Sequence, residues 1–181
     1  MSAFRRALPL MTAAGLLLCA WPLSGVAQEA AAAVKLAGRA VPEIDKLPAG
    51  PQRDLVQYGH DLTVRTFALI GPEVANKNMR YAGNNLACAS CHQQAASKPF
   101  AMPWTGVTAT FPQYRAREDD ISTVEERVNG CMERSMNGKA LPLGSREMKA
   151  FVAYAAFLSQ GIPVGASIDG HRDIVGDTAS G

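Results

Sequence analysis

The tightest constraint on this chain is the run Cys88-Ala89-Ser90-Cys91-His92. The spacing C-x-x-C-H is typical of covalent haem attachment, in which both thiols add to the haem vinyl groups. The short turn sets the two sulfurs at one edge of the porphyrin and holds the imidazole against the iron as a ligand. The same cysteine spacing also occurs in redox pairs and in half of a zinc site.

The sequence around the motif favours haem over these alternatives. A redox C-x-x-C pair usually lies between a strand and a helix, and no strand pattern precedes Cys88. A zinc site would need two further close ligands. We therefore predict one covalently attached haem c, with Cys88 and Cys91 as attachment sites and His92 as an iron ligand.

Residues 1–27 have the pattern of a cleaved secretory signal peptide. Arg5 and Arg6 supply the positive start, and an apolar stretch extends to about Leu23. Small residues then fit a cleavage site ending at Ala27. Prolines and a glycine interrupt the apolar stretch, whereas a retained anchor needs about 20 unbroken apolar residues. We expect export to the periplasm and no membrane span after cleavage.

Loss of the signal also removes the excess of positive charge. The whole chain has 18 basic and 16 acidic residues, and the signal contains two arginines and no acidic residue. The mature chain is then neutral, with 16 of each. Overall charge therefore gives no support for nucleic-acid binding, and any anion site must be local.

The remaining chain divides into three predicted parts. Residues 28–52 are Ala-rich and then punctuated by proline and glycine, as in an N-terminal leader segment. Residues 53–165 carry the haem motif and the helix signals, and form the predicted haem domain. Residues 166–181 are polar and Gly-rich, and are predicted to form a C-terminal tail.

Three segments of the haem domain have the apolar spacing and the end residues of helices: 54–69, 122–136 and 145–158. Ser122 and Glu125 have the spacing of a capping box, and Ser145 can cap the last segment. Gly59 and Tyr154 suit a close crossing between the first and last helices. With no strand alternation of note, we predict an all-α, cytochrome c-like helical domain around one covalently bound haem.

Cys131 is the odd cysteine of the mature chain and a candidate second iron ligand. On a helix from Ser122, Arg127 and Ser135 recur four residues on either side of Cys131 and share its face. The neighbouring Gly130 is expected to let the backbone approach the haem. A thiolate ligand would lower the redox potential, whereas a methionine would raise it.

Methionine ligation remains an alternative. Most soluble electron carriers use methionine as the sixth ligand, and Met136 and Met102 are the candidates that compete with Cys131. In that case Cys131 is a small buried hydrophobic side chain. Spacing favours Cys131 and leaves both methionines open.

Three runs resemble the tetrathionate-forming thiosulfate dehydrogenases, c-type cytochromes related to the SoxA subunit of the sulfur-oxidation system. They are GNNL at 83–86, FPQYRAR at 111–117 and RVNGCMERSMNG at 127–138. The resemblance covers about residues 42–166, and its cysteine-centred run is long and specific. It implies the N-terminal, active-site haem domain of such enzymes.

The resemblance implies a haem ligated by His92 and Cys131, with Arg117, Arg127 and Ser135 as substrate-binding residues. Thiosulfate is a dianion, and guanidinium groups suit such a ligand. The alternative for the two arginines is solvated charge beside the acidic residues Glu118, Asp119, Asp120 and Glu126.

The chain departs from these enzymes in one respect, because it has no second C-x-x-C-H motif. We therefore expect a second c-type cytochrome on a separate polypeptide, or a relative with changed activity. The leading interpretation is an enzyme that oxidises thiosulfate to tetrathionate, or the reverse, and exchanges electrons with that partner. The alternatives are a pure electron-transfer cytochrome c and a SoxA-like subunit of a sulfur-oxidation complex.

Overall fold

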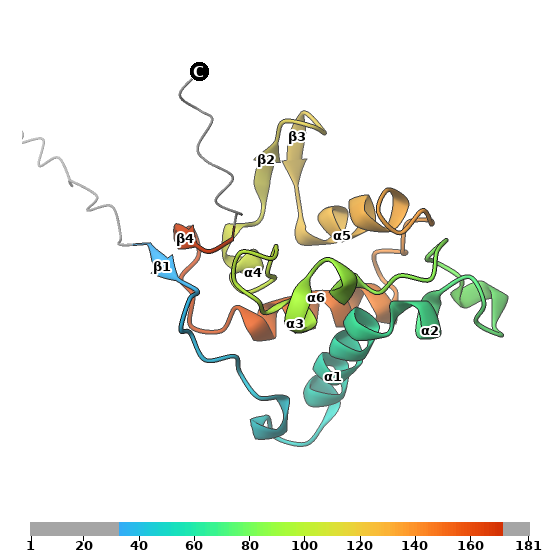
Figure 1. The fold of residues 1–181 in the computed structure, drawn as a ribbon, viewed down its shortest axis with the longest axis horizontal. Coiled ribbons are helices and arrows are strands. Elements are labelled where there is room, and N and C mark those ends of the chain that lie inside the picture. Colours follow the sequence, from blue (N-terminus) through green and yellow to red (C-terminus); the bar gives the residue numbers. More distant parts are fainter. Residues whose placement is uncertain (1–32, 172–181) are drawn as a thin grey trace, which may run out of the picture. The chain divides into compact units, whose positions relative to one another are not determined.

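The computed structural model describes residues 33–171, so the predicted signal peptide and most of the predicted tail lie outside the described residues. The α-helices of this range are α1 (Pro51–Val64), α2 (Thr66–Ile70), α3 (Gln93–Ala96), α4 (Val107–Thr110), α5 (Val124–Glu133) and α6 (Arg146–Leu158) (Figure 1). Short 3-10 turns are η1 (Ile44–Lys46), η2 (Lys77–Met79) and η3 (Cys88–Ser90). Helices dominate, and the predicted helical fold class is confirmed.

The first predicted helix is two helices in the structure. It begins earlier than expected, with Pro51 at the first helical position, where a missing N–H has no cost. It breaks at Arg65, whose φ of −134° is not helical. The hydroxyls of Thr63 and Thr66 donate to carbonyls four residues back, at 2.8 and 2.6 Å, and such bonds bend helices.

The other two helices start at capping side chains. Thr123 Oγ1 accepts the Glu126 N–H at 3.2 Å, and the Glu126 carboxylate accepts the Thr123 N–H at 2.7 Å. This capping box lies one residue later than predicted, and α5 ends at Glu133 rather than at 136. Ser145 caps α6 as predicted by accepting the Met148 N–H at 3.1 Å.

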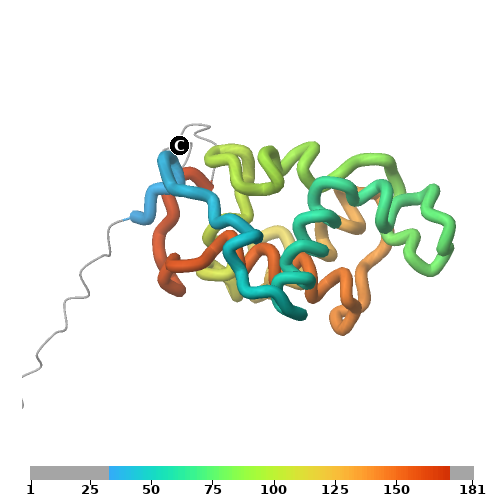
Figure 2. The backbone as a smooth tube through the Cα atoms, turned by 90° about the horizontal axis from the view of Figure 1, so that it is seen from below, coloured from blue at the N-terminus to red at the C-terminus, as the bar shows by residue number. Residues whose placement is uncertain are grey.

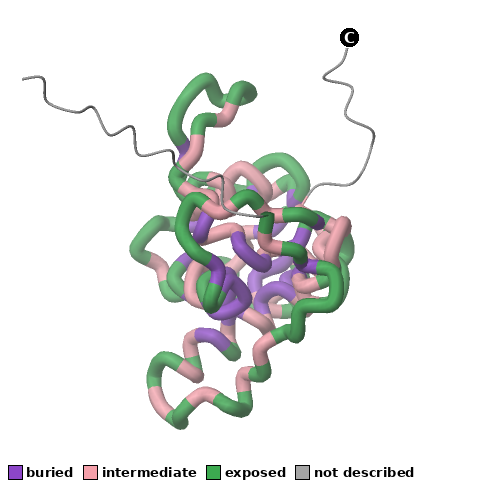
Figure 3. Tube along the Cα trace, turned by 90° about the vertical axis from the view of Figure 1, so that its left-hand side faces the viewer, coloured by how far each residue is buried: buried purple, intermediate pink, exposed green. Residues whose placement is uncertain are grey.

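Helices α1 and α6 cross closely at Gly59. A Cβ atom there would overlap the Ala150 carbonyl oxygen and lie 2.7 Å from Tyr154 Cβ. The predicted close crossing is therefore confirmed. The main core forms around it, from buried Leu62, Phe151 and their neighbours, and Figure 3 shows that buried positions gather where the helices pack.

Two short ladders accompany the helices and were not expected from the sequence. Strands β2 (Gln113–Arg115) and β3 (Asp120–Ser122) form an antiparallel hairpin that extends beside α5 (Figure 1). Strands β1 (Val34–Lys35) and β4 (Ile168–Asp169) pair in parallel, and Figure 2 shows these two ends of the described chain side by side.

The β1–β4 pair means that residues 166–171 are folded against the leader segment rather than belonging to a separate tail. The Leu36 N–H donates to the Asp169 carbonyl at 3.0 Å, and the Phe100 N–H donates to the Gly170 carbonyl at 2.8 Å. Leu36 is buried and packs with Ile162 and Ile168. Among the described residues, no helix has the length and apolar character needed to cross a membrane.

Candidate haem site

The C-x-x-C-H motif is held as a tight turn beside α2. Its 3-10 turn η3 is closed by the N–H groups of Cys91 and His92, which both donate to the Cys88 carbonyl. Thr66 fixes the start of the turn, because its buried hydroxyl accepts the Cys88 N–H at 3.0 Å. Burial raises the pKa of the Cys88 thiol to about 11, so this side chain is a neutral thiol before attachment.

His92 is oriented as an iron ligand needs to be. Its Nδ1 lies 2.5 Å from the Met102 carbonyl oxygen. A carbonyl only accepts, so this contact places the proton on Nδ1 and leaves the lone pair of Nε2 for a metal. Burial lowers the pKa of His92, which keeps the imidazole neutral, as a ligand must be. The Trp104 ring packs against the imidazole, with the two ring centroids 5.5 Å apart.

Helix α5 supplies the second set of candidate residues. Arg127 Nη1 donates to Cys131 Sγ at 2.8 Å, so the predicted shared helical face brings these two side chains together. Ser135 lies beyond the end of α5, and its carbonyl accepts a hydrogen bond from the Asn84 side chain at 3.0 Å. The predicted helical spacing therefore does not extend to Ser135.

One cavity of about 1230 Å³ joins the two sets. Its lining includes Cys88, Cys91 and His92 from the motif, and Arg127, Cys131 and Ser135 from α5 and the turn after it. Pockets for drug-sized ligands are typically about 300–1,000 Å³, so this cavity has room for a larger group. Its apolar walls, paired thiols and oriented imidazole fit a covalently attached haem.

The competing methionines lie at different places in this cavity. Met102 lines it with a half-exposed side chain, but its carbonyl is the partner of His92 Nδ1. This contact fixes the Met102 backbone beside His92 and leaves its side chain in the cavity wall. Met136 is buried and also lines the cavity, next to the α5 residues in sequence. The choice among Cys131, Met136 and Met102 stays a prediction.

The structure does not bring Arg117 into the cavity. Arg117 is exposed in the turn between β2 and β3, whereas Arg115, on β2, lines the cavity. Sequence reasoning missed Arg115. In the structure Gln113 and Arg115 lie on one face of β2 and exposed Tyr114 on the other, but three residues are too few to show this alternation in the sequence.

The expectation that Gly130 lets the backbone approach the haem stays a prediction, and Gly130 is not among the residues that line the large cavity. A Cβ at Gly130 would lie 2.8 Å from Arg134 Nη2, and Gly130 borders a smaller cavity of about 420 Å³ instead. Successive helix positions point about 100° apart, so the residue beside Cys131 faces another direction.

Comparison with known proteins places these features in a family. The family model described as "SoxA/TsdA, cytochrome c domain" matches residues 77–164. A thiosulfate dehydrogenase of Psychrobacter arcticus is 48% identical over 88 residues, which cover 49% of this chain and 27% of that protein. A thiosulfate dehydrogenase of Thiomonas intermedia is 32% identical over 160 residues, which cover 88% of this chain and 48% of that protein.

The fold agrees with a solved relative. The structure of the thiosulfate dehydrogenase TsdBA from Marichromatium purpuratum superposes with a TM-score of 0.65 and 27% sequence identity, covering 73% of this chain and 28% of that one. The chain thus spans less than half the length of each of these relatives. The predicted cytochrome c-like fold is confirmed, and a cytochrome c domain implies a haem c cofactor. The chain belongs to the TsdA-like, SoxA-related family of c-type cytochromes.

Proposed function

We propose that this domain is the catalytic part of a periplasmic thiosulfate dehydrogenase. In this proposal it oxidises thiosulfate to tetrathionate, or runs the reverse reaction, and exchanges electrons with a second c-type cytochrome. The observation that carries the proposal is the 2.8 Å contact between Arg127 Nη1 and Cys131 Sγ, in the wall of the cavity that also contains the haem-attachment motif.

The role of the chain's own residues follows from the charge of the substrate. Thiosulfate is a dianion, and the Arg127 guanidinium offers it charge-assisted hydrogen bonds beside the Cys131 sulfur. Ser135 lines the same cavity and can add a hydroxyl donor. The resemblance adds Arg117, which lies in the hairpin turn.

A haem attached at Cys88 and Cys91 would supply a one-electron redox centre, and a Cys131 thiolate as its ligand would favour ferric iron. The Met102 carbonyl accepts the Nδ1 proton of His92, which fixes the orientation of the ring and leaves the Nε2 lone pair free to bind iron. Trp104 packs against both His92 and Phe151, with ring centroids 5.5 and 5.8 Å away, and adds an apolar surface to that side of the cavity.

Cys131 can act as the sulfur that carries an intermediate. Its thiolate forms a sulfur–sulfur bond with the outer sulfur of one thiosulfate, and two electrons leave to the partner cytochrome. The outer sulfur of a second thiosulfate then attacks that bound sulfur. A new sulfur–sulfur bond forms, tetrathionate departs, and the electron pair of the broken bond returns to Cys131 as thiolate. Atoms and charge balance over the two steps.

A pure electron-transfer cytochrome is the second candidate, and Met136 is the observation that favours it. This side chain lines the cavity and is buried, as an axial methionine would be. In that arrangement Cys131 has no chemical role, and thiosulfate is not a substrate.

Turnover distinguishes the two candidates. Purified holoprotein is mixed with thiosulfate and ferricyanide as one-electron acceptor, and both acceptor reduction and tetrathionate are measured. An enzyme forms one tetrathionate for every two electrons transferred, and Cys131→Ala abolishes the reaction. A carrier reduces or oxidises partners without any dependence on thiosulfate, and that result would contradict the proposed function.

A further inference from the structure

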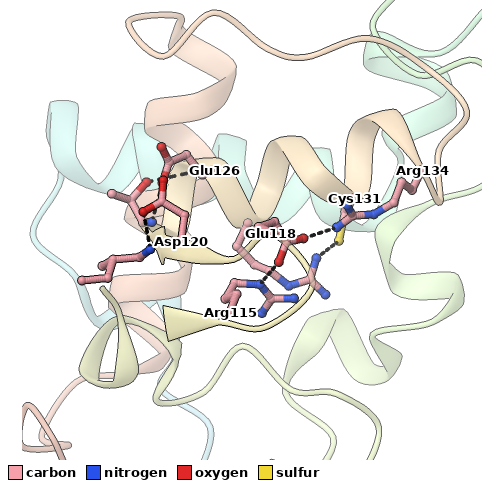
Figure 4. A network of polar contacts seen from close by, with 9 residues as sticks. Arg115, Glu118, Asp120, Glu126, Cys131 and Arg134 are labelled. Carbon is pink, nitrogen blue, oxygen red and sulfur yellow. Dashed lines mark hydrogen bonds and ion pairs between the residues drawn. The ribbon is translucent and has the colours of Figure 1, made fainter. Parts of the chain in front are cut away.

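Three charged residues form a network on the hairpin side of α5. Arg115 Nε donates to Glu118 Oε2 at 3.1 Å, and Arg134 Nη2 donates to Glu118 Oε1 at 3.1 Å (Figure 4). Each oxygen of the carboxylate therefore has its own arginine. Because one carboxylate joins two guanidinium groups, the network keeps a net positive charge.

Arg115 is the member of this network that also lines the large cavity containing the haem-attachment motif. It lines both the large cavity and the smaller one, and Arg127 is the other arginine that does so. Within residues 33–171, its hydrogen bonds use only Nε. An arginine has five N–H donors in a planar fork, so both terminal nitrogens of Arg115 stay available for an anion.

Gly130 leaves room for the far end of the network. Arg134 reaches back across α5 toward Glu118, and its Nη2 would lie 2.8 Å from a Cβ at position 130. A Cβ at this position would require the Arg134 guanidinium to shift from its place beside the carboxylate. Gly130 thus leaves space for the Arg134 side chain, which holds Glu118, and Glu118 in turn holds Arg115.

A second cation is needed beside Arg127. The Arg127 guanidinium already donates to Cys131 Sγ, whereas both thiosulfate and tetrathionate carry two negative charges. We propose that Arg115 is the second anion-binding arginine of the cavity, and that Glu118, itself held by Arg134, is a positioning residue that keeps the Arg115 guanidinium at the cavity wall. This assignment rests on the proposed function, because it takes thiosulfate as the anion.

Arg117 is the competing choice, since the resemblance gives it a substrate role. It lies two residues further along, in the exposed turn after β2 has ended, and it does not line the cavity. Among the described residues no carboxylate or carbonyl fixes its guanidinium. Arg115 is both at the cavity and held in place.

The test is equilibrium binding of thiosulfate to the ferrous holoprotein, which has no oxidised acceptor and so cannot turn over. Titration calorimetry at constant ionic strength compares wild type with Arg115→Gln, Arg115→Lys, Arg117→Gln and Glu118→Gln. Arg53→Gln is the matched control, because Arg53 is also ion-paired, at 2.7 Å to Asp45, but does not line the cavity. The haem stain establishes that each variant carries its haem, and circular dichroism together with the absorption spectrum establishes that it is folded.

We expect Arg115→Gln to weaken thiosulfate binding roughly 10- to 100-fold, as expected for a lost charge-assisted contact. Arg115→Lys keeps the charge but loses the planar fork of N–H donors, so its Kd for thiosulfate lies between those of the wild type and Arg115→Gln. Arg53→Gln binds thiosulfate as the wild type does. Glu118→Gln weakens binding by up to about fivefold. In the Arg115→Gln background the Glu118 change has no further effect, because Glu118 acts through Arg115.

Each contrary outcome has a distinct meaning. Wild-type affinity in Arg115→Gln, or a loss confined to Arg117→Gln, would overturn the assignment of Arg115. An equal effect of Glu118→Gln in both backgrounds would overturn its positioning role. Failure of the wild type to bind thiosulfate would also overturn the assignment. Wild-type protein that binds thiosulfate, with Arg115 dependence, but never reduces ferricyanide would contradict only the proposed function.

Discussion

Arg127 lies one helical turn before Cys131 on α5, and its Nη1 atom is 2.8 Å from the cysteine Sγ. The pair joins a sulfur that can bind iron or substrate to a cation that can hold a sulfur oxyanion. Both side chains line the cavity that contains the haem-attachment motif. This relationship links the ligand hypothesis to the substrate hypothesis, and each can be tested separately.

The first prediction concerns haem attachment. Replacing both Cys88 and Cys91 by Ala removes the two sulfurs that can form thioether bonds, so denatured protein should lose its haem peroxidase stain on a gel. Cys131→Ala is the matched control, because it removes a thiol of the same cavity that takes no part in attachment. Stain that survives in the double variant would contradict the cytochrome interpretation.

The second prediction concerns Arg127. Arg127→Gln removes the charge next to Cys131 and keeps a polar side chain, so the KM for thiosulfate should rise while the haem stays attached. Loss of a charge-assisted contact amounts to about 1.5–3 kcal/mol, or roughly a tenfold to hundredfold change. Steady-state kinetics with ferricyanide measure this, with Arg53→Gln as the control. Unchanged kinetics would return Arg127 to the role of a solvated surface charge.

The third prediction concerns the helix crossing at Gly59. Gly59→Ala forces a Cβ against the Ala150 backbone carbonyl, which cannot move without shifting α6. We expect a loss of about 1–3 kcal/mol in the free energy of unfolding, measured by denaturant titration of the holoprotein. Gly144→Ala is the control, because nothing lies within 4 Å of a Cβ there. Equal unfolding midpoints for the two variants would show that the helices do not cross closely.

The fourth prediction concerns pH. Desolvation raises the pKa of the Glu118 carboxyl, but the hydrogen bonds and charges of Arg115 and Arg134 together outweigh it, so the pKa lies below its usual value. A carboxyl with a lowered pKa in the folded state stabilises the fold above its unfolded pKa of about 4.3, and this contribution disappears as pH falls through the folded value. The Tm of wild type should therefore exceed that of Glu118→Gln at pH 7, and the difference should vanish in acid. A difference that grew on acidification would contradict the network.

Local features of the fold were predictable because their causes are local. The haem motif is one contiguous run, the cap at Ser145 acts within three residues, and the Arg127–Cys131 spacing is one helical turn. The close crossing at Gly59 was also predictable, because only a glycine lets two backbones approach so nearly.

The features that escaped prediction depend on distant partners or on very short elements. Val34 pairs with Ile168 over two residues, which is too short to show an alternating pattern. Strand β2 has only three residues, so the side of the hairpin that faces the cavity could not be read from FPQYRAR alone. Arg115 was therefore overlooked in favour of Arg117. The split after Val64 depends on hydroxyl bonds that are visible only once the helix is built.

The central claim is that Cys131 is the second ligand of the haem iron, and Cys131→Met tests it most directly. The variant keeps the attachment cysteines and replaces a thiolate by a neutral thioether, which favours ferrous iron. The measurement is low-temperature electron spin resonance of the ferric protein. We predict a thiolate-ligated low-spin signal in the wild type that is absent from the variant. An identical signal in the two proteins would show that Cys131 does not bind the iron, and would leave Met136 and Met102 as the candidate ligands.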